Sequence, residues 1–420
     1  MFPLLRFDFI KMRRSRFTFI LLLLLLLVVG GYYFYIDKKE MPMEEVETLI
    51  LSNLELNRVE YEAAQKEVDE SDGFMGMELK HRFENSERQY RSYQLMHEGF
   101  TNEDWAVYWQ GELMNIGNME ETKRKELLHV KNSYTWYTPF TVFSHMDQMR
   151  WMEERGIQPV FPTHWGSWLT LYDQEFSDPV LEKVVNKGSV KYSSSGFHFI
   201  YYVFQYGFGL MGLLFFLFLF ADIVTKEGFG RNGPIYMLRT QPIRRTSFWL
   251  SKSIFVMVGS AATILFVALI GLGFGLAFNR IGDWDYPILI YGTDRTYSFL
   301  TIAEFLGKSS VMFLLVLALV FSLLFLFSLL TNRAILAIGL TSIVIFVGQM
   351  LTDQAMLLSF AHWIPFNYIE AYPIVNGAYA IEKNNALFTY NQGILSLAWS
   401  TSIILLITVA LVKLKKGVRV

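Results

Sequence analysis

Two uninterrupted apolar runs constrain this chain more than any other feature of its sequence. Residues 19–29 read FILLLLLLLVV, and residues 210–221 read LMGLLFFLFLFA. Such runs are typical of membrane-spanning helices, because about 20 apolar residues of helix cross the core of a bilayer. Only 18% of the 420 residues are charged, whereas a soluble domain carries about a quarter. These features exclude a soluble enzyme and a disordered chain.

The residue types that usually carry catalysis or metal binding are missing or scattered. The chain has no cysteine, which excludes a thiol nucleophile, an iron–sulfur cluster and a Cys-ligated zinc. Its seven histidines show no recognised metal-ligand spacing. The segment Gly307-Lys308-Ser309-Ser310 resembles the end of a phosphate-binding loop, but Ile302 stands where that loop needs its first glycine. We therefore expect no catalytic residue, no metal and no cofactor in this chain.

Six stretches are apolar enough to cross a membrane, and they predict an all-α polytopic membrane protein. We place these spans at residues 17–36, 199–221, 248–278, 309–330, 334–352 and 394–412. The first span follows a basic segment, residues 1–16, and no small-residue cleavage site comes after it, so we interpret it as an uncleaved anchor. Glycines at 207, 209 and 212 in span two, and at 271, 273 and 275 in span three, favour close helix packing over the alternative of lining a pore.

The distribution of charge predicts the orientation. Residues 1–16, 222–247, 331–333 and 413–420 together contain 15 Lys or Arg and three acidic residues. By the positive-inside rule these short segments are cytoplasmic, so both termini are expected inside. The basic residues follow this inner face and form no sustained nucleic-acid surface, so we expect lipid and not nucleic acid as a partner.

Residues 37–197 form a large extracytoplasmic domain between spans one and two, with 17 basic and 29 acidic residues. Apolar residues recur at helical spacing over 42–70, 77–98, 102–131 and 140–155, so we expect a mainly helical domain. Its six tryptophans either pack inside the domain or form a surface for an amphipathic substrate. They are Trp105, Trp109, Trp136, Trp151, Trp165 and Trp168.

The predicted cytoplasmic loop 222–247 contains an ordered series of residues that continues into span three. The series comprises Glu227, Gly233, Leu238, Thr240, Pro242, Arg244 or Arg245, and Lys252. It resembles the loop of ABC-2 type permeases, the membrane subunits of one class of ATP-binding-cassette transporter. In that family this loop forms a coupling helix that docks on the ATPase subunit. The alternative is a basic loop that only contacts anionic lipid.

Two further segments strengthen the resemblance. Residues 1–16 look like the interfacial helix of the family, with Leu5, Phe9, Met12 and Arg13 as its expected site residues. Residues 353–393 resemble the outer or re-entrant segment of the family, with Pro365, Asn376 and Gly377 at matching positions. A subset of the family also has a large domain after the first span.

The resemblance implies a function for the chain. It would be the permease subunit of an ABC transporter that exports an amphipathic peptide, lipid or drug across the cell membrane, which we expect to be a bacterial plasma membrane. ATP and Mg would bind to partner ATPase subunits, and a second permease copy or paralogue would complete the transporter. The alternatives are a membrane sensor or immunity protein that binds a ligand through its outer domain, and a membrane-embedded enzyme. Few charged residues lie in the spans to support the enzyme.

Overall fold

A computed structural model divides the chain into two compact units. The first unit comprises Met1–Tyr33, Gly196–Asn279 and Ala303–Val420, and the second comprises Phe34–Ser195 and Arg280–Ile302. The structure describes residues 2–70, 76–116, 127–128, 137–161, 169–173, 180, 183, 187, 190–225, 245–331, 333–356 and 358–414. The predicted insertion therefore shares its unit with a second piece of chain, residues 280–302.

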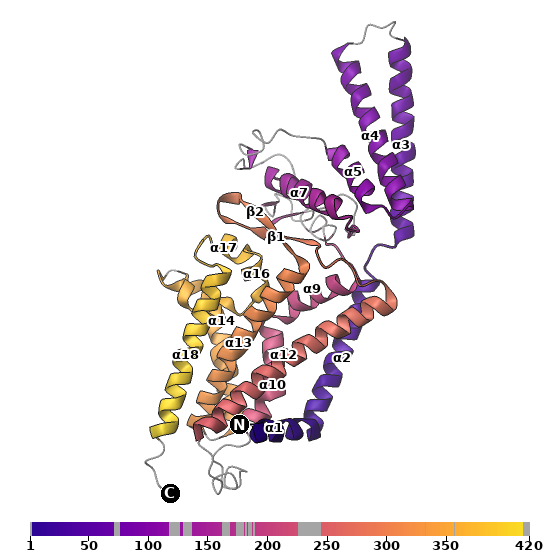
Figure 1. Cartoon of the computed structure of the whole chain (residues 1–420). Coiled ribbons are helices and arrows are strands. Elements are labelled where there is room, and N and C mark those ends of the chain that lie inside the picture. The colour runs from indigo at the N-terminus through magenta and orange to yellow at the C-terminus, as the bar shows by residue number, and fades with distance from the viewer. Residues whose placement is uncertain are drawn as a thin grey trace. The chain divides into compact units, whose positions relative to one another are not determined.

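The first unit is built from long apolar helices (Figure 1). They are α1 (Phe2–Arg14), α2 (Arg16–Asp37), α9 (Gly196–Gly207), α10 (Leu210–Thr225), α12 (Arg245–Phe278), α13 (Ile302–Thr331), α14 (Ala334–Met350) and α18 (Tyr390–Leu414). Ser15 separates α1 from α2, and its hydroxyl accepts a hydrogen bond from the backbone N–H of Thr18 at 3.3 Å, as an N-cap residue does. The apolar stretch of α13 is 67% buried, compared with 17% in α2 and in α18. Helix α13 therefore forms the core of this unit.

Four of the described helices are long and apolar enough to cross a membrane by themselves. They are α2, α13, and the parts of α12 and α18 over Trp249–Phe278 and Tyr390–Lys413. The pair α9–α10 adds a fifth span if its two helices are counted together. Helix α14 has 17 residues, fewer than the roughly 20 that cross a bilayer without thinning it. The structure thus supports four or five of the six spans that the sequence predicts.

The predicted second span is not one straight helix. Helices α9 and α10 meet at an angle of 82°. At the bend, the ring centroid of Phe208 lies 4.0 Å from that of Phe204 and 4.4 Å from that of Phe313 in α13. The carbonyl oxygen of Phe208 accepts a hydrogen bond from the backbone N–H of Ala371 at 3.2 Å. Contacts with α13 and with Ala371 therefore stabilise a bend where hydropathy predicts one continuous helix.

The second unit is mainly helical, as the sequence predicts. It contains α3 (Met43–Glu70), α4 (Met77–Thr101), α5 (Trp105–Ile116), α7 (Pro139–Arg155) and the short η1 (Leu171–Asp173). Helices α3 and α4 lie side by side as an antiparallel pair (Figure 1). Arg82 of α4 donates hydrogen bonds to both carboxylate oxygens of Glu67 in α3, at 3.1 and 2.9 Å. Of the tryptophans in this unit, Trp109 is buried and its indole N–H donates to the carbonyl of Ile157 at 2.7 Å, whereas Trp284 is exposed.

A two-stranded antiparallel sheet completes the second unit, and the sequence analysis does not foresee it. Strand β1 (Pro287–Tyr291) pairs with β2 (Tyr297–Thr301) in a register that aligns Leu289 with Phe299. Both strands are rich in aromatic and β-branched residues, which suit a pleated surface. A short 3-10 turn, η2 (Thr293–Arg295), joins them. Residues 280–302 thus form a folded element and not a plain connection between α12 and α13.

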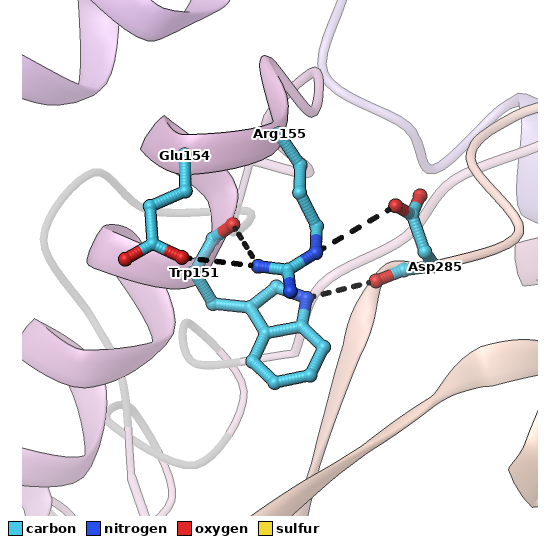
Figure 2. Close-up of polar contacts among 4 residues, drawn as sticks. All are labelled: Trp151, Glu154, Arg155 and Asp285. Carbon is cyan, nitrogen blue, oxygen red and sulfur yellow. Dashed lines mark hydrogen bonds and ion pairs between the residues drawn. The ribbon is translucent and has the colours of Figure 1, made fainter.

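This hairpin segment is attached to α7 by polar contacts around one aromatic ring (Figure 2). The indole N–H of Trp151 donates to the backbone carbonyl of Asp285 at 3.0 Å. The guanidinium of Arg155 lies 3.9 Å from the centroid of the Trp151 ring, and its Nε lies 3.9 Å from the Asp285 carboxylate. One turn earlier in α7, Gln148 donates to the carbonyl of Pro287 at 3.0 Å. These contacts explain why residues 280–302 belong to the second unit.

The second unit also contains a half-buried lysine, Lys191, which contributes an alkaline pH dependence to its stability. Burial lowers the pKa of Lys191 from 10.5 to about 8, against the opposing attraction of Glu112. Between pH 8 and 10.5 the unfolded chain therefore binds more protons at this lysine than the folded chain does. The contribution of Lys191 to stability then rises with pH across that window. We expect Lys191→Met to flatten this rise.

The measurement is the unfolding temperature of the full chain, followed by tryptophan fluorescence at pH 7.5 and pH 9.5. Lys187, which is exposed, provides the matched control, and Lys187→Met should keep the wild-type rise. If Lys191→Met gains as much stability at alkaline pH as the wild type does, the titration of Lys191 is not responsible for the rise.

Candidate coupling site

Most of the predicted loop series lies outside the described residues. This applies to Glu227, Gly233, Leu238, Thr240, Pro242 and Arg244. Arg245 is the first residue of α12, and its side chain is not described. Lys252 lies two turns further along α12 and is fully described. Within this series, Lys252 of α12 is thus the residue whose side-chain contacts the structure describes.

Helix α1 confirms that the N-terminal segment is helical, and its residues divide into two faces. Leu5 and Met12 are half-buried, whereas Phe9 and Arg13 are exposed. Phe7 and Ile10 are exposed as well. The half-buried positions 4, 5, 11, 12 and 15 surround Asp8 at helical spacing, and Asp8 itself is 1% exposed. Helix α1 thus packs through a face centred on an acidic residue, and Phe7, Phe9 and Ile10 point away from that face.

The partner of Asp8 is Lys252. The ammonium group of Lys252 forms an ion pair and hydrogen bond with the Asp8 carboxylate. Their side chains are 3% and 1% exposed, and 244 residues separate them in the chain. The structure therefore joins two segments that the sequence analysis treats separately, namely the predicted interfacial helix and the end of the coupling series.

Sequence reasoning identifies Lys252 but misses Asp8. A signal for it exists, because Asp8 is the one acidic residue among the first 16, which also contain five Lys or Arg. A single acid within so basic a segment indicates a specific interaction, and a lysine inside an apolar span needs a counter-charge. The two facts fit each other, but only tertiary structure brings the residues together.

The first turns of α12 also contact α13. The Trp249 ring lies 5.3 Å from the Phe325 ring in an edge-to-face arrangement. One turn beyond Lys252, Val256 is completely buried. The start of α12 is thus held on one side by the ion pair to α1 and on another by the most buried helix of the unit. A displacement at this end of α12 would act on both neighbours.

The outer-segment residues form a separate cluster between α14 and α18. Short helices fill this stretch: α15 (Thr352–Ala355), η3 (Ala361–Trp363), η4 (Pro365–Tyr368), α16 (Ala371–Val375) and α17 (Ala378–Glu382). Pro365 begins η4. The Asn376 side chain is buried and accepts a hydrogen bond from the N–H of Ala378 at 3.0 Å. Gly377 has a φ of 77°, a left-handed conformation that favours glycine. Asn376 and Gly377 therefore shape the turn between α16 and α17, whereas Pro365 begins a different element.

The arrangement of the described residues fits a mechanical role. Long apolar helices and a buried ion pair that fastens the N-terminal helix define the class: an α-helical membrane protein with four or five candidate membrane spans among its described residues. Among the described residues, no group of three or more His, Cys, Asp or Glu side chains could hold a metal ion.

Comparison with known proteins gives the family. The family model described as "ABC-2 family transporter protein" matches residues 2–416. The chain belongs to this family, which makes it the permease, or membrane-spanning subunit, of an ABC transporter. No curated protein and no solved structure matches the chain.

Proposed function

We propose that this permease exports an amphipathic substrate (a peptide, lipid or drug), using ATP that a separate cytoplasmic subunit hydrolyses. The observation that carries the proposal is the attachment of the start of α12. This helix follows directly on the loop whose residue series resembles a coupling helix. It is tied to α1 by Asp8–Lys252 and to α13 by Trp249–Phe325. A force on the loop would therefore reach three helices of the first unit.

The proposal assigns positions and partners to the rest of the molecule. Both termini and residues 226–244 would face the cytoplasm, and the second unit would lie outside, where it gates or shields the exit. Two ATPase subunits carrying ATP and Mg would bind the loops of two permeases, which are either copies of this chain or a pair with a paralogue. A bacterial plasma membrane would supply the surrounding lipid. The abundance of exposed apolar residues on α12, α14 and α18 supports contact with lipid or a second permease.

A co-purification experiment tests the coupling part of the proposal. We expect the tagged wild-type protein, extracted gently from its native membranes, to bring a cytoplasmic ATPase with it. Glu227→Ala combined with Leu238→Ala should lower the recovered ATPase, or its hydrolysis rate, at least tenfold. The reason is that the variant removes a charge and an apolar side chain from the expected docking helix.

The matched control changes the same residue types elsewhere. Glu55 and Leu56 are exposed neighbours on α3 of the second unit, and replacing both by alanine should leave recovery and hydrolysis unchanged. If no ATPase accompanies the wild type, the permease would not be coupled through this loop. The sensor or immunity function would then be tested by screening the full chain for ligand binding that does not depend on ATP.

A further inference from the structure

The Asp8–Lys252 pair is costly to bury. Both side chains are almost completely inaccessible. Removing two charges from water is repaid only if they pair closely. Ionisable residues within apolar helical bundles are rare, and those that persist usually serve the function. An apolar contact between α1 and α12 would hold the helices together without this cost.

The position of the pair indicates what it does. Lys252 lies seven residues after Arg245, the first residue of α12. It is therefore close to the residues that precede this helix in the chain. Asp8 occupies the centre of the packed face of α1, with Leu5 and Met12 beside it. An ion pair at this place constrains which face of α1 lies against α12. The exposed face of α1, including Phe7, Phe9 and Ile10, is thereby also oriented.

We propose that Asp8 and Lys252 are positioning residues that lock α1 to the first turns of α12, so that both helices move as one body when the ATPase acts. The inference rests on the proposed function, because the force is assigned to the ATPase. It adds that the N-terminal helix is part of the transmission and is not only a membrane anchor. Breaking the pair removes the close counter-charge from the side chain that stays buried, which favours displacement of α1 or of Lys252.

A double-mutant cycle on coupled ATP hydrolysis tests this role. The variants are Asp8→Asn, Lys252→Met and the two combined, each reconstituted in nanodiscs with the co-purified ATPase. We expect each single variant to lower the maximal hydrolysis rate at least tenfold, with the KM for ATP and the amount of bound ATPase unchanged. The combined variant should be no worse than the poorer single variant, since it removes both buried charges together. A loss that multiplies in the combined variant would overturn the proposal.

A second measurement follows the docking of α1 without any ATPase. The segment contains Arg6, Lys11, Arg13 and Arg14, so a detached α1 should be cut by trypsin several times faster than a docked one. We expect faster cleavage in both single variants and a near wild-type rate in the combined variant. Lys413 on α18 is an exposed cation outside α1, and Lys413→Met is the control for loss of one charge, because it leaves every cleavage site of α1 in place.

The outcomes separate this inference from the proposed function. Faster cleavage with unchanged coupled hydrolysis would make the pair a structural anchor only, which overturns the transmission role. Unchanged cleavage and hydrolysis in the single variants would overturn the lock itself. A wild-type preparation without an associated ATPase would overturn the proposed function, while the cleavage rates would still decide whether the pair locks α1. If a single variant fails to accumulate, recovery in the combined variant supports the lock, and failure of both contradicts it.

Discussion

Replacing Gly212 by alanine is expected to destabilise the first unit more than any other exchange of a glycine for alanine in its helices. A Cβ atom at this position would lie 1.7 Å from the carbonyl oxygen of Gly207, across the bend between α9 and α10. No side-chain movement can relieve that overlap, because the opposing atom belongs to the backbone. The bend of 82° would have to open. Overpacking of this kind costs about 3 kcal/mol or more.

The bend cannot open without loss of other contacts. Phe208 at its corner stacks between Phe204 and Phe313, and the Phe208 carbonyl accepts the hydrogen bond from Ala371. A straightened α9–α10 would withdraw that carbonyl and separate the aromatic rings. We therefore expect Gly212→Ala to lower the unfolding temperature of the full chain in nanodiscs, measured by tryptophan fluorescence, and to lower coupled ATP hydrolysis.

Two other glycines in the same unit are matched controls. Added Cβ atoms at Gly207 and at Gly273 would meet no atom within 4 Å. Gly207→Ala and Gly273→Ala should therefore unfold close to the wild-type temperature, or slightly above it because alanine favours helix. Equal stability of Gly212→Ala and these two variants would contradict the bent arrangement of α9 and α10. It would favour the continuous span that hydropathy predicts.

Replacing Asp173 by alanine is expected to destabilise the second unit strongly. The Asp173 carboxylate is 5% exposed and accepts hydrogen bonds from the backbone N–H groups of Thr138 at 2.7 Å and Thr170 at 2.9 Å. It also accepts from the hydroxyls of Thr141 and Thr170. Thr138 is the N-cap residue of α7. This one carboxylate therefore joins η1 to the beginning of the helix that supports the hairpin.

The size of the effect follows from the donors that alanine would leave behind. Each buried donor that loses its partner costs about 1–3 kcal/mol, so the loss for two backbone N–H groups and two hydroxyls is about 4 kcal/mol after partial relaxation. We expect Asp173→Ala to lower the unfolding temperature of the full chain and to speed proteolysis of the second unit. Asp69, exposed in the last turn of α3, is the control, and Asp69→Ala should change neither quantity. Equal behaviour of the two variants would contradict this account of the network.

Hydropathy and charge predict much of the first unit, because these properties act locally along the chain. The helices α2, α12, α13 and α18 lie close to their predicted ranges, since an apolar run of that length can satisfy its backbone hydrogen bonds in lipid only as a helix. Helices α3, α4 and α7 also follow from their spacing of apolar residues. The family too was recognisable from sequence, because its motifs are short segments of ordered residues, and the match over residues 2–416 confirms it.

Features that depend on partners distant in sequence could not be predicted in the same way. The run over 210–221 is apolar whether or not the helix bends before it, and the bend depends on Phe313 and Ala371, which lie more than 90 residues away. Residues 280–302 show no long periodic pattern, and their place in the second unit depends on contacts with Trp151 and Arg155 of α7.

The sequence by itself determined that this chain is a helical membrane permease with a large insertion, because apolar length, charge bias and local motifs are properties of neighbouring residues. Only the tertiary structure decided that Asp8 pairs with Lys252, that α9 and α10 meet at a sharp angle, and that a hairpin joins the insertion. The physical reason is that a buried charge needs a partner and a bend needs packing contacts. In both cases the residues that supply them are distant in the sequence.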